Sequence, residues 1–127
     1  MRTITVAYDG SYYTFKWLKV LLWARREFKK NGFKIQLLSL TSYFPPFTTE
    51  QNQLDLALKK TNLDIVFLAF HYSTSSIGQD LESRQAFLLN LKRRCNKIVW
   101  LDTADSTGNC LFDVMPYVDG YFKKQIL

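Results

Sequence analysis

Three polar segments, far apart along the chain, carry the side chains best suited to chemistry. They are Asp9-Gly10-Ser11, the segment that begins at His71, and the segment Asp102–Asn109, which includes Asp105 and Ser106. Their hydroxyl, amide and carboxylate groups suit a polyhydroxylated ligand, because each sugar hydroxyl both donates and accepts hydrogen bonds. The alternative is that the Asp and Ser residues only form turns and cap helices, as they commonly do.

His71 is the only histidine in the chain and the one candidate for a catalytic residue. An imidazole with an unperturbed pKa of about 6.5 serves as a general base near neutral pH. The sequence shows no partner that would orient it, and a single histidine of this kind is more often structural. Both roles are therefore kept open for His71.

The familiar motifs for metals, phosphates and nucleophiles are missing. Two residues separate Asp102 from Asp105, whereas one separates the acids in the Asp-x-Asp metal motif of some sugar transferases. Cys95 and Cys110 lack the CxxC spacing of a structural zinc site. The chain contains no GxGxxG after its first predicted strand, no GxxxxGK(S/T) and no GxSxG. We therefore predict no metal site and none of the standard phosphate-binding loops.

The positive charge of the chain is concentrated near its beginning. The formal net charge is +6, and the segment up to Lys34 accounts for it with eight basic and two acidic residues, while the rest carries nine of each. A nucleic-acid-binding protein would spread basic residues over the elements that contact the nucleic acid. Here most of the excess lies in one predicted helix, which argues against a nucleic-acid partner and for a single cationic face.

That helix is predicted over Thr14–Asn31 and ends at Asn31-Gly32. At about 100° per residue, its core face consists of Trp17, Val20, Leu21, Ala24 and Phe28. The opposite face places Trp23 among the basic residues Lys16, Lys19, Arg26 and Lys30. A tryptophan ringed by long cationic side chains is typical of an interfacial membrane surface or a protein interface. It also suits a solvated face on which Lys and Arg stems cover one ring.

Strands and helices alternate along the whole chain. The predicted strands are Arg2–Tyr8, Phe33–Leu40, Asp64–Phe70, Lys97–Leu101 and Tyr117–Phe122. Further helices are predicted from Thr48 or Thr49 to Thr61, over Asp80–Cys95 and, as a short segment, over Leu111–Met115. This alternation implies right-handed crossovers and a parallel sheet. We therefore predict a single Rossmann-like α/β domain over residues 1–127, with a mostly parallel five-stranded sheet and helices on both faces.

The order of the strands decides which polar segments meet. Ligands of open α/β sheets bind beyond the carboxyl ends of the strands, where the strand order reverses. In the order 3-2-1-4-5, Asp9–Ser11 would face Asp102–Ser106 across this point. In the order 2-1-3-4-5 the third strand is the partner of the first, which brings His71 forward instead. Both orders fit the sequence.

The chain contains no apolar run near the ~20 residues that span a bilayer, and it begins without a signal-peptide pattern. Two cysteines do not make a disulfide framework. These features predict reduced thiols and a cytoplasmic location.

The end of the chain resembles a known family. Asp102-Thr103-Ala104-Asp105-Ser106, followed by FDVMPYVDGYFKKQ at residues 112–125, resembles the N-terminal region of bacterial glycosyltransferases of the two-lobed GT-B type. The resemblance is clearest over residues 102–127. It implies a Rossmann-like lobe that contacts a sugar or lipid-linked acceptor, while a second glycosyltransferase lobe holds most of the nucleotide-sugar donor.

The chain departs from that family in length. A GT-B enzyme needs roughly two domains' worth of residues, whereas this sequence stops at Leu127. The resemblance therefore implies the acceptor-side lobe of a longer protein, which binds no cofactor and has no activity by itself. By analogy with transferases that act on lipid-linked acceptors, the basic helix would place it at the inner face of an anionic membrane.

A second resemblance supplies an alternative. Val6-Ala7-Tyr8-Asp9-Gly10-Ser11, followed by a helix, is similar to the opening of universal stress proteins, whose first-strand aspartate contacts an adenine nucleotide. That family also has a glycine-rich phosphate loop near its C-terminus, for which Gly108 and Gly120 are too few. The alternatives are thus a stand-alone nucleotide-binding module through Asp9–Ser11, or a domain that docks to a membrane or partner through its basic helix.

Overall fold

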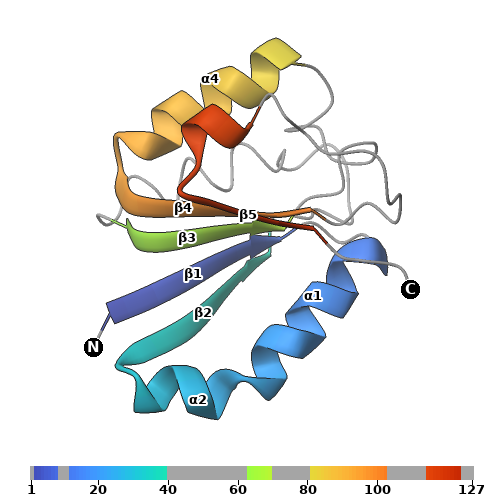
Figure 1. Ribbon diagram of the computed structural model, residues 1–127, viewed down its shortest axis with the longest axis vertical. Helices are drawn as coiled ribbons and strands as arrows, with labels where there is room; N and C mark the ends of the chain where they lie inside the picture. Colours follow the sequence, from blue (N-terminus) through green and yellow to red (C-terminus); the bar gives the residue numbers. More distant parts are fainter. Residues whose placement is uncertain (1, 9–11, 40–62, 70–80, 103–113, 124–127) are drawn as a thin grey trace.

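A computed structural model describes residues 2–8, 12–39, 63–69, 81–102 and 114–123 (Figure 1). Its five strands form one sheet and are β1 Arg2–Tyr8, β2 Phe33–Ser39, β3 Leu63–Ala69, β4 Cys95–Asp102 and β5 Gly120–Lys123. Every neighbouring pair is parallel, and the strand order is β2-β1-β3-β4-β5. The predicted Rossmann-like α/β domain is confirmed. Of the two orders that the sequence allowed, the structure has 2-1-3-4-5.

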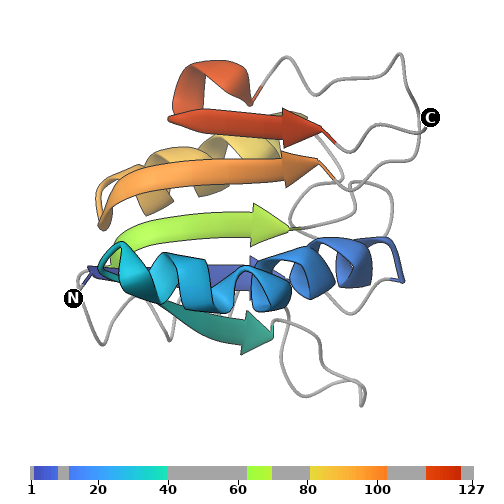
Figure 2. The same ribbon diagram turned by 60° about the horizontal axis from the view of Figure 1, so that its bottom comes forward.

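Helices lie on both faces of the sheet. The helices α1 (Tyr12–Trp23) and α2 (Arg25–Lys30) cover one face, and α4 (Leu81–Lys92) and the 3-10 helix η1 (Met115–Tyr117) cover the other (Figures 1 and 2). The crossover from β1 leads to β2 on one side of the sheet, and the crossover from β3 leads to β4 on the other side. Because right-handed crossovers that run in opposite directions lie on opposite faces, α1 and α4 cover different faces of the sheet. The helix predicted from Thr48 or Thr49 to Thr61 lies outside the described residues.

The single helix predicted over Thr14–Asn31 bends at Ala24, between α1 and α2. Ala24 has φ −83° and ψ 2°, and helical hydrogen bonds continue across it. Its amide donates to the Val20 carbonyl at 3.1 Å, and the Phe28 amide donates to the Ala24 carbonyl at 3.1 Å. The predicted stop is confirmed: α2 ends at Lys30, and Gly32 has the positive φ, 86°, that a residue without Cβ adopts easily.

The core face of α1 differs from the prediction at one position. Trp17, Leu21, Ala24 and Phe28 are at least half-buried as predicted, but Val20 is 52% exposed, and Leu18, at 8%, is buried instead. Successive residues of an α-helix lie about 100° apart. The buried arc is centred near Leu21 and Leu18, so Val20 turns about 100° away from Leu21 and leaves the core.

Two hydrophobic clusters sandwich the sheet. The α4-side cluster consists of Ala7, Leu63, Val66, Leu68, Phe87, Leu88, Leu91, Ile98, Trp100 and Val114. The α1-side cluster consists of Ile4, Val6, Leu18, Leu21, Ile65, Ala69 and Leu101. The central strand β3 contributes to both clusters, which explains its nearly unbroken apolar sequence.

Two boundaries lie three residues from their predicted positions, the end of the helix now called α4 and the start of the last strand. Cys95 was expected to close the helix Asp80–Cys95, but it opens β4, where it pairs with Leu63. The chain turns just before it, and the Cys95 thiol donates a hydrogen bond to the Leu91 carbonyl at 3.2 Å. Burial, with a smaller contribution from Asp119, raises the pKa of this thiol to about 11. At the other boundary, η1 delays the last strand to Gly120.

Candidate functional site

The strand order places the reversal point between β1 and β3. The crossover that follows β1 leads outward to β2, whereas the chain from β3 proceeds to β4 on the other side. Tyr8 and Ala69, the last residues of β1 and β3, are partners in the parallel register. Asp9–Ser11 follow Tyr8 in the sequence, and His71 comes two residues after Ala69. That these two segments meet at a ligand site beyond the ends of the strands stays a prediction. We call the point between the carboxyl ends of β1 and β3 the β1/β3 crevice.

Most of the predicted crevice residues lie outside the described residues. This is the case for Asp9, Gly10, Ser11 and His71, and also for Asp105 and Ser106 after β4. Their contacts with a ligand stay predictions. Since β3 separates β1 from β4, the ends of those two strands are about two strand spacings, or ~10 Å, apart. The prediction that Asp9–Ser11 faces Asp102 depended on the order 3-2-1-4-5, which is not the order of this sheet.

Asp102 is the one predicted crevice residue whose side chain the structure describes. It ends β4 and is only 2% exposed. The Tyr121 hydroxyl of β5 donates a hydrogen bond to its Oδ2, and the Trp17 indole Nε1 donates to its carbonyl oxygen at 3.0 Å. Asp102 therefore ties α1 and β5 to the carboxyl end of β4. A role in ligand contact stays a prediction for this residue.

Trp17 and Tyr121 form part of this edge, and the sequence analysis did not identify them as such. Trp17 was assigned to the core, where its ring packs against the α1-side cluster, but its indole N–H reaches the end of β4. Tyr121 pairs with Trp100 in register and packs against the α4-side cluster. Only the pairing of β5 with β4 brings its hydroxyl to Asp102, so no local sequence signal reveals this contact.

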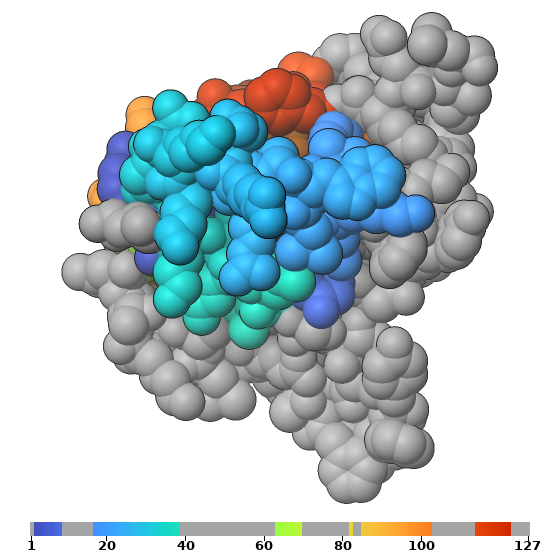
Figure 3. All heavy atoms as spheres, turned by 90° about the horizontal axis from the view of Figure 1, so that it is seen from below, coloured from blue at the N-terminus to red at the C-terminus, as the bar shows by residue number. Residues whose placement is uncertain are grey.

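The predicted basic face belongs to α1 and α2, whose surface Figure 3 shows in blue to cyan. Lys19, Trp23, Arg26 and Lys30 are all exposed, and Trp23 is 74% exposed. The Lys19 ammonium lies 5.4 Å from the centre of the Trp23 ring, within the range of a cation–π interaction. For Lys16, the structure describes only the backbone position within α1.

Val20, which was predicted in the core but is exposed, lies on the same side of α1 as Trp23. It precedes Trp23 by three residues, a spacing at which helical side chains are neighbours. We call the set Lys19, Val20, Trp23, Arg26 and Lys30 the basic-aromatic face. The segment Tyr12–Lys30 has six basic residues and a single acidic one, Glu27. The Glu27 carboxylate pairs with the Lys30 ammonium at 3.3 Å, and both side chains are exposed.

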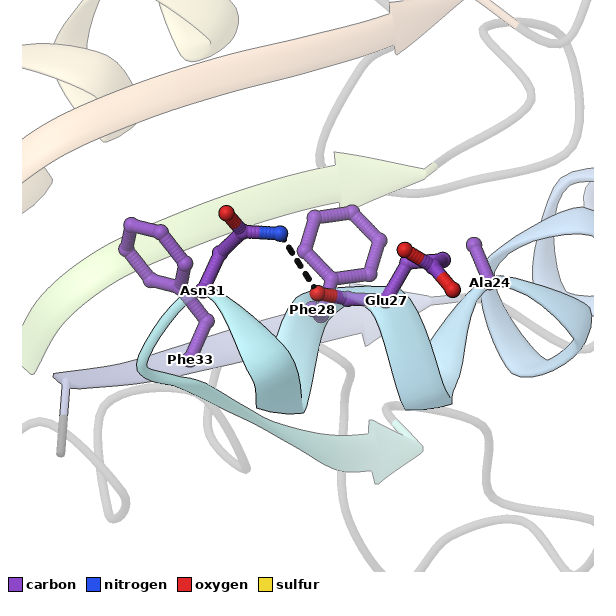
Figure 4. Close-up of a pocket in the computed structure, with 5 residues that line it drawn as sticks. All are labelled: Ala24, Glu27, Phe28, Asn31 and Phe33. Carbon is purple, nitrogen blue, oxygen red and sulfur yellow. Dashed lines mark hydrogen bonds between the residues drawn. The ribbon is translucent and has the colours of Figure 1, made fainter.

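An open hollow of about 400 Å³ lies at the junction of α2 and β2 (Figure 4). Its described walls are Ala24, Glu27, Phe28, Asn31 and Phe33. The Asn31 amide donates to the Glu27 carbonyl at 2.7 Å, which holds that side chain against the helix end. Glu27 is the only titratable residue among these walls, and Phe33 begins β2, at the end of the sheet opposite the β1/β3 crevice. The hollow offers an apolar contact surface rather than catalytic groups.

At the same amino-terminal end of the sheet, Asp64 forms hydrogen bonds with side chains of both neighbouring strands, a group that we call the polar tie. The Asn96 amide donates to Oδ1 of Asp64 at 2.9 Å, and the Arg2 guanidinium donates to both carboxylate oxygens at 3.4 Å. The hydrogen bond from Asn96, followed by that from Arg2, holds the pKa of Asp64 below its usual range. Because these three residues come from β4, β3 and β1, the tie links three strands at the end remote from the crevice.

In the described part of the chain, His, Cys, Asp and Glu side chains do not gather in groups of three that could hold a metal ion. The helices described there are also too short or too polar to cross a membrane.

Comparison with protein-family models, with curated proteins and with solved structures found no match for this chain.

Proposed function

We propose that this domain binds a polar, hydroxyl-bearing ligand in the β1/β3 crevice, as the acceptor-side lobe of a nucleotide-sugar glycosyltransferase. The observation that supports it is the strand order, which reverses between β1 and β3. Open α/β sheets bind their ligands at this point, beyond the carboxyl ends of the strands. The further proposal that the domain belongs to a glycosyltransferase rests on the sequence resemblance over residues 102–127.

The residues that follow the two strands suit such a ligand. Asp9 and Ser11 provide a carboxylate and a hydroxyl for sugar hydroxyl groups, and Gly10 between them has no side chain to obstruct a ligand. His71, which follows β3 in the sequence, is the candidate for a general base on an acceptor hydroxyl. The donor would be a nucleotide sugar held by a second lobe, so the isolated domain is expected to bind its acceptor without turning it over.

Ligand-observed NMR on the 127-residue chain tests the crevice, with maltose as a sugar probe and UDP-glucose as a donor probe. We expect saturation transfer to maltose, lost in Asp9→Asn and in His71→Ala. The control is Lys34→Ala, which changes an exposed residue near the amino-terminal end of β2, remote from the crevice, and is expected to retain binding. Unchanged binding in both Asp9→Asn and His71→Ala, or no transfer to maltose in the wild type, would contradict the assignment to β1 and β3.

The second candidate, an adenine-nucleotide module, uses the same crevice through Asp9 and is favoured by its position directly after β1. Calorimetry with ATP distinguishes the two. Saturable ATP binding that Asp9→Ala weakens, without transfer to maltose, would replace the sugar proposal with the nucleotide one. An absence of heat up to millimolar ATP would exclude the nucleotide module.

A further inference from the structure

The basic-aromatic face leaves exposed a side chain that is usually buried. Trp100 is fully buried and Trp17 is half-buried, whereas Trp23 keeps 74% of its surface in contact with water. Val20 beside it is 52% exposed, so the outer side of α1 presents an apolar ridge. Removal of this ridge from water would be favourable, and nothing among the described residues of the chain itself covers it.

The charge around this ridge has one sign. Of the basic side chains on α1 and α2 that the structure describes, Lys19, Arg25, Arg26, Lys29 and Lys30 are all exposed. Glu27 is the only acidic residue of the two helices, and it pairs with Lys30. The long Lys and Arg stems are apolar along their length, so they lie beside an apolar ridge while their charged ends reach water or anionic groups.

An anionic lipid bilayer matches both properties. Tryptophan favours the level of the lipid headgroups, and basic residues on the same face are attracted to anionic lipids. α1 lies along the surface of the domain (Figure 3), and its exposed Trp23 and Val20 can enter a bilayer interface without a matching pocket. A protein partner would instead require a pocket that receives Trp23.

We propose that the basic-aromatic face is a docking surface for an anionic membrane, with Trp23 and Val20 in the headgroup region and Lys19, Arg26 and Lys30 against lipid phosphates. The docking does not depend on the ligand of the β1/β3 crevice, because its residues lie on the outer side of α1 and α2. Either proposal can therefore fail without the other.

Vesicle sedimentation tests the docking surface. We expect the 127-residue chain to pellet with vesicles that contain phosphatidylglycerol and not with pure phosphatidylcholine, and to be released by salt. Trp23→Ala should weaken binding by about tenfold, and the pair Lys19→Ala and Arg26→Ala by at least as much. Leu89→Ala is the matched control: Leu89 is an exposed apolar residue on α4, on the opposite face of the sheet, and its removal should leave binding unchanged.

A fluorescence titration separates insertion from simple attraction of charges. Trp23 is the most exposed of the three tryptophans, so we expect a blue shift with anionic vesicles, absent in Trp23→Phe. Equal binding to neutral and anionic vesicles, or equal loss in Leu89→Ala, would overturn the proposal. So would binding to a single-stranded oligonucleotide with no binding to vesicles. Circular dichroism of each variant confirms that the fold is retained.

Discussion

The hydrophobic residues on the two faces of the sheet are shielded from solvent to different degrees. On the α4 side, Leu88, Leu91, Trp100 and Val114 are completely buried. On the α1 side, Leu18 and Leu21 retain slight exposure, and Phe28, Phe33, Phe67 and Val99 are only partly buried. The edge strand β5 adds Phe122, which is 56% exposed. In the described part of the molecule, the α4 side is thus a sealed core and the α1 side an incompletely covered one.

The path of α1 and α2 accounts for the difference. α1 and α2 run back along the sheet in front of β1, from Trp17, whose indole reaches the end of β4, to the contacts of α2 with β2 (Figure 2). In this view no described helix lies in front of β4 and β5. The comparison indicates that stability comes mainly from the α4 side, and that the α1 side and its outer helix surface are available for contacts.

The largest expected effect distinguishes the two cores directly. Leu91→Ala creates a cavity in the sealed α4-side cluster, and we expect it to lower the free energy of unfolding by about 3–5 kcal/mol. Leu21→Ala, in the less covered α1-side cluster, should cost about 2–3 kcal/mol because water and neighbouring side chains can fill the space. Urea unfolding measures both. An equal or larger loss for Leu21→Ala would refute the difference between the faces.

An intermediate effect is expected at Tyr121. Tyr121→Phe removes the hydrogen bond to the buried Asp102 carboxylate and should cost about 1–3 kcal/mol. Asp102→Asn changes the acceptor of the same hydrogen bond. The double variant should therefore lose less free energy of unfolding than the sum of the losses of the two single variants. Strict additivity in this double-mutant cycle would show that the pair does not brace the end of β4.

A smaller effect is expected at Asp64, which ties β3 to both neighbouring strands at the opposite end of the sheet. Its pKa in the folded state is lowered by Asn96 and then by Arg2. The folded state therefore binds the proton more weakly than the unfolded chain, so the stabilisation is present above the ordinary pKa of 3.8 and is lost as the pH falls through the lower, folded value.

Unfolding measured as a function of pH tests this tie. Wild type should lose stability more steeply below pH 3.8 than Asp64→Asn, which lacks the titrating group. Asn96→Ala and Arg2→Ala should each flatten the profile, because both side chains lower the pKa of Asp64. Identical profiles for wild type and Asp64→Asn would show that this tie makes no pH-dependent contribution.

The smallest expected effect on folding is at Trp23. Because its ring is mostly exposed, Trp23→Ala should change the free energy of unfolding by less than about 0.5 kcal/mol, although tryptophan is the largest side chain in proteins. Thermal unfolding under the same conditions checks this value. A loss of several kcal/mol would mean that Trp23 belongs to the core of the α1 side and not to a contact surface.

The elements themselves were largely predictable, because their signals are local. Arg2–Tyr8 was predicted to the residue, and Gly32 as the stop of the first helix followed from its conformational freedom. The basic residues and Trp23 of the basic-aromatic face followed from residue spacing, since Lys19 and Trp23 are neighbours on any α-helix, whereas its Val20 was predicted in the core. The prediction placed Val20 in the core, whereas Leu18 is buried instead. This error arose because the sheet beneath the helix decides which side of the helix is buried.

What the sequence determined by itself was the set of strands and helices, their parallel winding and the concentration of charge on one helix, since each depends on residues close together in the chain. Tertiary structure alone decided the strand order and with it the pairing of β1 with β3, the hydrogen bond between Tyr121 and Asp102, and the unequal closure of the two faces. Either strand order satisfies the same local patterns with right-handed crossovers. The choice between them depends on the summed packing of segments that are distant in sequence, which no local pattern contains.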